Sequence, residues 1–187
     1  ALSSAASDVY KRQVYNHLAM SGCLDQEKMI NVLKEVRLFE VFENQGGLNF
    51  QLNEGAKNLS GGQRQRVWIA MSLAQQTNII LLDEPTTYLD LNHQLEVLEL
   101  LKKLNQEEKV TIVMVLHDLN LACKYSDYLL AMKDGQVFDF GSSNDVFNEN
   151  MLKECFAIEG EIIKDSKTNK NVCVSYDLYK KESEHES

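Results

Sequence analysis

The feature that most constrains the fold of this chain is one eight-residue segment, residues 59–66, with the sequence Leu-Ser-Gly-Gly-Gln-Arg-Gln-Arg. A serine followed three residues later by a glutamine forms a capping box, so Ser60 is predicted to begin a helix. Downstream, the apolar run 79–82 predicts a short strand that is buried on both faces of a parallel sheet. Asp83 and Glu84 follow this run, at the strand end where α/β folds bind their ligands.

Strand and helix patterns alternate through much of the remaining chain. Apolar residues recur every three to four positions in residues 14–42, which predicts helices. Asp90 is expected to cap a further helix, whose apolar face is formed by Leu91, Leu95, Leu98, Leu101 and Leu104. The β-branched run Val110 to Leu116 predicts a second strand, followed by another helix. This order indicates an α/β architecture.

Two antiparallel pairs are predicted near the C-terminus. Residues 128–132 and 136–140 flank the dipeptide Asp134-Gly135, which favours a tight hairpin turn. Ile162-Ile163 is expected to pair with residues 172–174 across a polar loop.

Composition excludes several classes of protein. The net charge of −9 argues against a nucleic-acid partner that is held by phosphate contacts. No apolar run approaches the roughly 20 residues that span a bilayer, so membrane association would need a partner. The cysteines form no C-x-x-C pair and are interpreted as inert thiols in a reducing compartment: Cys23, Cys123, Cys155 and Cys173.

Residues 59–66 match the signature sequence of ATP-binding cassette (ABC) transporter ATPases, and the resemblance extends from about Val14 to Cys173. Ser-Gly-Gly-Gln alone is equally well explained as a helix cap and a turn, but the full segment favours the family. The resemblance implies four residues that bind the γ-phosphate of ATP held on a second subunit: Ser60, Gly61, Gly62 and Gln63. Glycine backbone and helix N–H groups suit an anion. A dimer, expected to be a homodimer, is therefore required.

Residues 79–84 resemble the family's Walker B motif. A buried strand that leaves its sheet through an acidic turn is the plainer interpretation of this run. The resemblance implies that Asp83 holds Mg²⁺ through water and that Glu84 acts as general base on the attacking water.

Two further segments match family motifs. Residues 86–90 match the D-loop, so Asp90 is expected to couple the two ATP sites as well as to cap its helix. His117 directly follows the second strand and occupies the position of the family's switch histidine, which implies contact with the γ-phosphate. A loop histidine without a role is the alternative. His17, His93 and His185 are interpreted as structural.

From Trp68 onward the chain resembles ATPase subunits of iron(III)-siderophore and related metal-chelate importers. The residues that most distinguish this subfamily from other ABC ATPases are Tyr88 and the His-Asp-Leu-Asn-Leu-Ala run at residues 117–122. This implies an integral membrane permease as partner, a substrate-binding protein as indirect partner, and a place on the cytoplasmic face of the cell membrane. The nucleotide-binding domain of an exporter and a non-transport ABC ATPase are the alternatives.

Residues 14–58 look more like an exporter's nucleotide-binding domain than like the importer subfamily. Natural divergence of the helical subdomain explains this, and so does a junction of two cassette genes at the shared signature sequence. The expected layout is a ragged or foreign segment (1–13), a helical subdomain (14–75), the C-terminal part of the ATPase core (76–176) and a disordered tail (177–187).

No phosphate loop of the form G-x-x-x-x-G-K-[ST] occurs in residues 1–187. The expected fold is therefore α/β, a partial P-loop NTPase of the ABC type. It has parallel core strands, a helical subdomain and C-terminal antiparallel strands, without its phosphate-loop lobe. By itself the chain is expected to be inactive and prone to aggregate through uncovered apolar surface.

Overall fold

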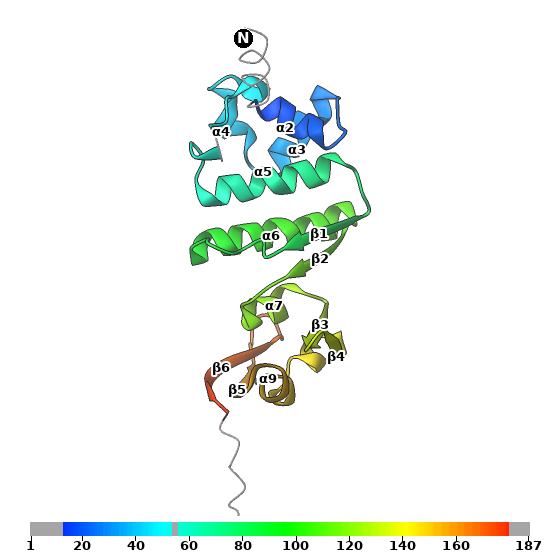
Figure 1. Ribbon diagram of the computed structural model, residues 1–187, viewed down its shortest axis with the longest axis vertical. Coiled ribbons are helices and arrows are strands. Elements are labelled where there is room, and N and C mark those ends of the chain that lie inside the picture. The colour runs from blue at the N-terminus through cyan, green and yellow to red at the C-terminus, as the bar shows by residue number, and fades with distance from the viewer. Residues whose placement is uncertain (1–12, 54–55, 180–187) are drawn as a thin grey trace, which may run out of the picture. The chain divides into compact units, whose positions relative to one another are not determined.

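The computed structural model describes residues 13–53 and 56–179, which form two compact units that divide between Val115 and Leu116 (Figure 1). The sequence layout places a boundary after residue 75. The units divide later because the helix at the signature sequence and the next long helix share one hydrophobic core. Among the described residues, no helix is long and apolar enough to cross a membrane.

Short helices form the N-terminal part of the first unit: α2 (Val14–Met20), α3 (Gln26–Glu35), α4 (Phe39–Glu43) and the 3-10 helix η1 (Gly47–Asn49). They confirm the helices predicted for residues 14–42. Asp25 is the N-cap of α3. Its Oδ1 accepts hydrogen bonds from the N–H groups of Glu27 at 3.0 Å and Lys28 at 3.3 Å. Gly46 precedes η1 with φ of 108°, a left-handed conformation that favours glycine.

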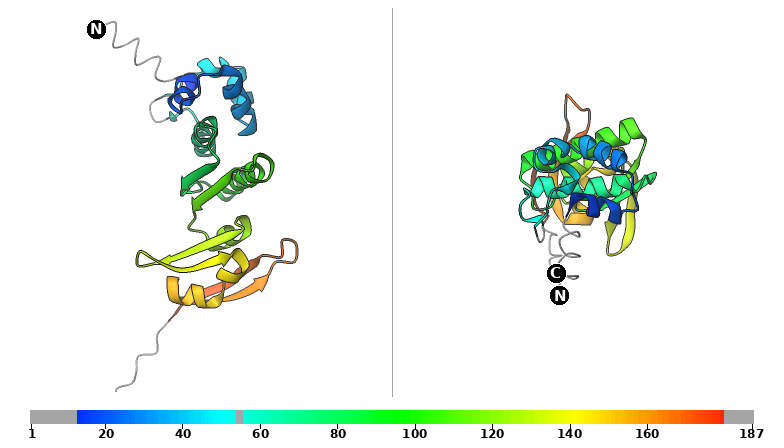
Figure 2. Two further views of the ribbon diagram at one scale, coloured as in Figure 1. Left: turned by 90° about the vertical axis from the view of Figure 1, so that its right-hand side faces the viewer. Right: turned by 90° about the horizontal axis from the view of Figure 1, so that it is seen from above.

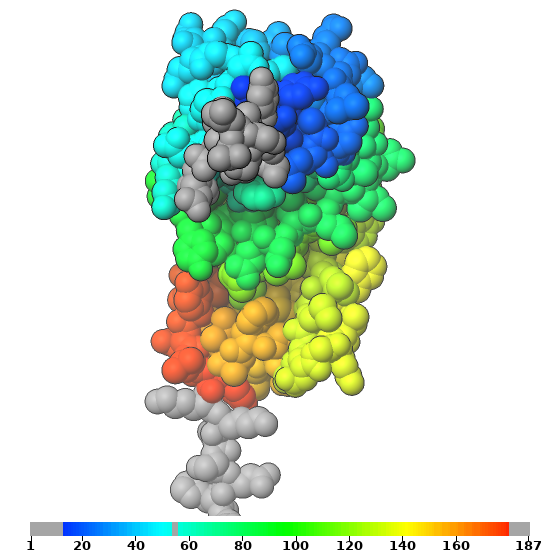
Figure 3. All heavy atoms as spheres, turned by 45° about the horizontal axis from the view of Figure 1, so that its top comes forward, coloured from blue at the N-terminus to red at the C-terminus, as the bar shows by residue number. Residues whose placement is uncertain are grey.

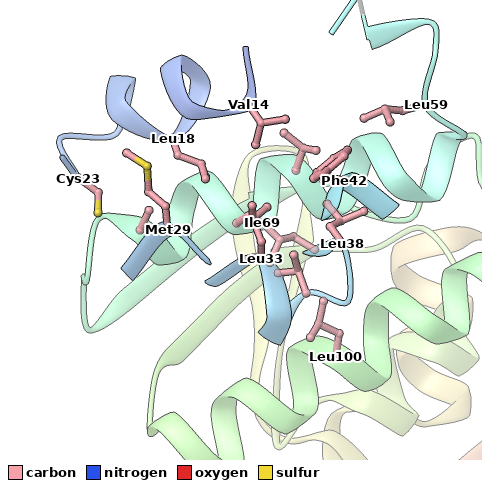
Figure 4. Packing of buried hydrophobic residues seen from close by; sticks show 14 of the residues in the cluster. Val14, Leu18, Cys23, Met29, Leu33, Leu38, Phe42, Leu59, Ile69 and Leu100 are labelled. Carbon is pink, nitrogen blue, oxygen red and sulfur yellow. The ribbon is translucent and has the colours of Figure 1, made fainter. Parts of the chain in front are cut away.

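The signature helix, α5 (Gly61–Ala74), supplies the centre of this unit's core. Ile69 is fully buried and lies next to Leu33 and Leu38, while Leu100 of α6 (Leu91–Glu108) reaches the same cluster (Figure 4). In the space-filling view, the N-terminal helices (blue and cyan) lie against the green part of the chain that follows them in the sequence (Figure 3). Each buried side chain of this size contributes about 1.5–3 kcal/mol, so this core fixes how α5 is oriented.

Strands β1 (Ile79–Asp83) and β2 (Thr111–Val115) form a parallel pair, as predicted. Their register aligns Ile79 with Thr111 and Asp83 with Val115. The crossover between them contains α6, which lies along the pair (Figure 2). Asp83 therefore ends the strand at the carboxyl edge of this small sheet.

The prediction that β1 is buried on both faces is wrong. Ile80 is 3% exposed, whereas its neighbour Leu81 is 75% exposed. In β2, Val113 and Val115 are also exposed, while Met114 packs against the core. Burial alternates because helices cover one face of the pair, and within the described part of the first unit nothing covers the other. That the chain aggregates through such uncovered apolar surface stays a prediction.

The second unit packs two antiparallel pairs with three helices: α7 (Leu119–Tyr125), β3 (Tyr128–Lys133), β4 (Gln136–Ser142), α8 (Ser143–Val146), α9 (Glu149–Phe156), β5 (Ile158–Lys164) and β6 (Asn171–Leu178). The predicted hairpin is confirmed, with positive φ at both turn residues, 51° at Asp134 and 75° at Gly135. The predicted C-terminal pairing is also confirmed, since Ile162 lies opposite Cys173.

The predicted disordered tail begins too early. Asp177 and Leu178 belong to β6, where they pair with Glu159 and Ile158. The strand continues because its partner β5 starts at Ile158 and offers backbone groups along this whole length. The expectations for residues 1–12 and 180–187 lie outside the described residues.

Asn120 connects α7 to β6. Its Nδ2 donates to the Cys173 carbonyl at 3.1 Å, and its Oδ1 accepts from the Cys173 N–H at 2.8 Å. The side chain thus satisfies both backbone groups of one strand residue, as a neighbouring strand would. Asn120 belongs to the run at residues 117–122, so that run has a structural function in the second unit.

Replacing Asn120 with alanine is expected to expose the amide of Cys173 to solvent exchange. Leaving a backbone pair unsatisfied costs about 1–3 kcal/mol, so the protection factor of this amide is expected to fall about tenfold or more. Peptide-resolved hydrogen exchange measures it. Asn150→Ala, at an exposed position of α9, is the control. Equal exchange in both variants would show that the bond contributes nothing.

Candidate functional site

The carboxyl end of β1 continues into a tight turn that orients Glu84. Glu84 has φ of 48°, in the left-handed region that non-glycine residues rarely adopt. Its Oε2 accepts a hydrogen bond from Thr87 Oγ1 at 2.9 Å, and its carbonyl accepts from the Thr87 N–H at 3.1 Å. Asp83, one residue earlier, is exposed. The turn therefore presents two adjacent carboxylates at the strand end, as the sequence predicts.

The next turn leads into α6 and is held at several points. The Leu89 N–H donates to the Thr86 carbonyl at 3.3 Å, and Gln94 Nε2 donates to the Leu89 carbonyl at 2.9 Å. Asp90 caps α6 through the N–H of His93 at 2.9 Å, which confirms the predicted cap. We call residues 86–93 the D-loop segment, because they comprise the D-loop match (86–90) and the start of α6; these hydrogen bonds define its backbone.

Ser60 and Gln63 form the predicted capping box at the start of α5. The Gln63 N–H donates to Ser60 Oγ at 3.2 Å, and Gln63 Oε1 accepts from the Ser60 N–H at 3.0 Å. Ser60 is exposed, and as a hydroxyl its Oγ keeps a proton that it can donate while it accepts the cap bond. The helix N-terminus carries partial positive charge, so it favours an anion.

The glycines of the signature sequence lie against the D-loop segment. A Cβ built at Gly61 would lie 3.2 Å from Leu89 Cδ2, and one at Gly62 would lie 2.6 Å from His93 Cδ2. The sequence interpretation is that these glycines let a phosphate approach the backbone. The structure adds a second reason, because each glycine also admits a side chain of the same molecule.

His93 is the residue that sequence reasoning missed. Its ring Nδ1 lies 2.7 Å from Asp90 Oδ1, and its Cδ2 faces Gly62. The backbone N–H and the ring of His93 both hold the pKa of the Asp90 carboxyl below its ordinary value. The helical spacing of three residues from the cap was the available signal, but the contact with Gly62 depends on how α5 packs against α6.

His117 lies in the second unit, exposed, just before α7. The next residue, Asp118, caps that helix by accepting from the Leu121 N–H at 2.8 Å. The first unit thus contains Ser60 to Gln63, Asp83, Glu84 and Asp90, while the switch-histidine position belongs to the second unit.

The carboxylate of Asp83 is the hard oxygen ligand that Mg²⁺ prefers. Within the described ranges, no group of three or more histidine, cysteine, aspartate or glutamate residues is arranged to hold a metal. A single exposed carboxylate suits an ion that takes its other ligands from water and phosphate oxygens, as Mg²⁺ does. The donor set therefore fits the implied ion.

The sequence is similar to known proteins. The sequence profile of the ABC transporter family matches residues 4–87. The chain is 58% identical over 126 residues to the iron(3+)-hydroxamate import ATP-binding protein FhuC of Bacillus subtilis, covering 67% of this chain and 47% of that protein. It is 54% identical over 118 residues to the petrobactin import ATP-binding protein FpuD of Bacillus anthracis, covering 63% and 43%. The chain thus spans about half the length of these curated relatives.

The fold is also known. A metal-chelate type ABC transporter in an inward-facing conformation matches with a TM-score of 0.71 and 24% identity, covering 87% of this chain and 66% of that one. At this identity the similarity shows the fold alone. It confirms the predicted α/β fold of the ABC ATPase type.

Proposed function

With the chain identified as ABC transporter ATPase sequence, we propose that it belongs to the ATP-hydrolysing subunit of an importer for an iron(III)-siderophore or a related metal chelate. The observation that carries this proposal is the 58% identity to an iron(3+)-hydroxamate import ATP-binding protein. The exposed N-terminus of α5 supports the phosphate contact, because Ser60 Oγ accepts the cap bond and keeps a hydroxyl proton to donate. The curated relatives are named as import proteins, which supports an importer over an exporter.

In the proposed reaction, water attacks the γ-phosphorus of ATP and ADP leaves. Glu84 accepts the proton of the attacking water, and Thr87 orients its carboxylate. Asp83 would hold Mg²⁺ through water, and the bound ion would supply positive charge to neutralise the phosphates. His117 donates a hydrogen bond to the γ-phosphate. Such donors stabilise the charge that develops in the transition state.

Ser60, Gly61, Gly62 and Gln63 act on the ATP of a second subunit, and Asp90 couples the two sites. The proposed assembly is a homodimer at the cytoplasmic face of the cell membrane, bound to an integral membrane permease that receives the chelate from a substrate-binding protein. With a net charge of −9, nucleic acid is not a proposed partner.

Uptake of radioactive iron(III)-hydroxamate by cells tests the transport function. Cells that depend on the Glu84→Gln form of a subunit carrying both this sequence and a phosphate loop are expected to lose ATP-driven uptake. Uptake equal to that of the unaltered subunit would contradict the proposal.

Residues 1–187 alone are expected to show no saturable ATP binding. In the P-loop NTPases, amides and a lysine of the phosphate loop cradle the β- and γ-phosphates, and this sequence contains no G-x-x-x-x-G-K-[ST] segment. A titration with a fluorescent nucleotide measures binding, and a subunit that carries a phosphate loop is the positive control. Saturable, Mg²⁺-dependent binding in the micromolar range would overturn this expectation.

A further inference from the structure

We propose that His93 is a positioning residue of the ATP half-site on α5. Its ring connects Asp90 to the signature helix, so that the helix N-terminus and the D-loop segment meet a second subunit as one piece. This inference rests on the proposed function, because it concerns how Ser60 and Asp90 are held in that reaction.

The first half of the connection is the pair of contacts between His93 and Asp90. The backbone N–H of His93 and its ring Nδ1 lie 2.9 Å and 2.7 Å from the same oxygen, Asp90 Oδ1. A carboxylate only accepts hydrogen bonds, so the ring donates from Nδ1. The other helix-capping aspartates, Asp25 and Asp118, accept from backbone N–H groups at 3.0 Å and 2.8 Å. At Asp90 the ring adds a side-chain contact, which fixes the direction of the imidazole.

The second half is the contact between the ring and the signature sequence. The built Cβ of Gly62 would lie 2.6 Å from Cδ2 of His93 and 3.2 Å from Cγ, and Gly62 is buried. Real Cβ atoms do not approach other atoms at 2.6 Å, so only glycine allows the ring to lie here. An alanine at this position would push either α5 or the ring away.

A second contact links the same two segments one residue away. Leu89 Cδ2 would lie 3.2 Å from a Cβ at Gly61, and the Leu89 carbonyl is held by Gln94. Neighbouring glycines therefore each accept one side chain from the D-loop segment. Contacts at two adjacent points restrict rotation as well as translation, so Ser60 and Asp90 keep a fixed separation. Catalysis that depends on placing donors at a phosphate is sensitive to such a separation.

The test is a double-mutant cycle of Gly62→Ala and His93→Ala, in a subunit that carries this sequence and a phosphate loop. Misplacement of catalytic groups by about 1 Å costs up to about 100-fold in rate, so each single change is expected to lower kcat about tenfold or more. The double variant is expected to be no slower than Gly62→Ala alone, because the alanine methyl group then occupies the space that the ring has left. Equilibrium ATP binding by each monomeric variant is expected to stay unchanged.

The variant His93→Asn keeps a side-chain N–H near the position of Nδ1, so it is expected to restore part of the kcat that His93→Ala loses. Gln106→Ala, at an exposed position near the C-terminal end of α6, is the control and is expected to keep the kcat of the unaltered subunit. Additive effects of the two changes, or an unaltered kcat in His93→Ala, would overturn the proposal.

Thermal unfolding of the same four proteins separates this inference from the proposed function. If the unaltered subunit hydrolyses no ATP, the proposed function fails. The unfolding midpoints still report the contact, because Gly62→Ala is expected to lower the midpoint less in the His93→Ala background than by itself. Equal lowering in both backgrounds would show that ring and glycine do not touch, which removes the basis for positioning.

Discussion

Glu84→Gln, in a subunit that carries this sequence and a phosphate loop, is expected to bind ATP normally and to lose turnover. An amide cannot take the proton of the attacking water, and general-base catalysis contributes about 10²–10⁴-fold to a rate. The substitution leaves the turn intact, because the glutamine Oε1 can still accept the hydrogen bond from Thr87 Oγ1 that the carboxylate accepts at 2.9 Å. Binding and chemistry are thus separated at one position.

Phosphate release and equilibrium binding of radioactive ATP measure the two effects. Glu107→Gln is the matched control, since Glu107 is an exposed residue of α6 in an ion pair with Lys103. Exposed pairs of this kind contribute little, so the control is expected to hydrolyse ATP at the unaltered rate. Turnover that survives in Glu84→Gln would remove Glu84 from the role of general base.

Ser60→Asp is expected to have a comparably large effect, on ATP-driven association of two subunits, because in the proposed dimer Ser60 faces the ATP that the other subunit binds. Aspartate is as good a helix cap as serine, so α5 should still begin at the same residue. Its charge, however, would face the γ-phosphate of the other subunit. Two like charges about 4 Å apart repel by about 4 kcal/mol at an effective dielectric constant near 20, which corresponds to about a thousandfold loss of ATP-driven association.

Ser60→Asn separates charge from capping, because asparagine has the shape of aspartate and also caps helices well. We expect the neutral variant to form ATP-dependent dimers far better than Ser60→Asp, as measured by light scattering in the Glu84→Gln background. Equal dimerisation by both variants would show that no phosphate approaches Ser60.

Local chemistry explains which parts of the fold could be predicted from the sequence. The capping box of Ser60 and Gln63, the cap at Asp90 and the hairpin at Asp134-Gly135 each depend on residues within one or two turns of chain. All of them are present in the structure as predicted. The carboxylates directly follow the apolar run 79–82 in the sequence, and β1 ends at the first of them, Asp83.

The layers that cover a strand could not be predicted in the same way. Apolar residues on both faces of β1 indicate that both faces avoid water, but they do not indicate which neighbour covers each face. Ile80 is buried by the core of the first unit, whereas Leu81 remains exposed. Similarly, the leucines of α6 were expected to face the core together, yet Leu91 at the helix start is 64% exposed and Val97 is buried.

The same distinction between local and long-range features applies to the residues of the candidate site. Ser60, Asp83, Glu84 and Asp90 occupy the helix caps and the strand end that the motifs predict. His93 could not be found from the sequence, because its contact with Gly62 joins two helices and depends on the packing of α5 against α6. Local patterns identify residues at the ends of elements, while contacts between elements require the folded structure.

Mixing two inactive subunits tests most directly whether the signature sequence acts on the ATP of a second molecule. One subunit carries Ser60→Asp and the other carries Glu84→Gln, both with a phosphate loop. In a mixed dimer, one ATP site contains both changes and the other contains neither. We predict that hydrolysis returns on mixing, well above the sum of the separate rates, once native mass spectrometry shows mixed dimers. Mixed dimers that remain as inactive as their two components would contradict the account.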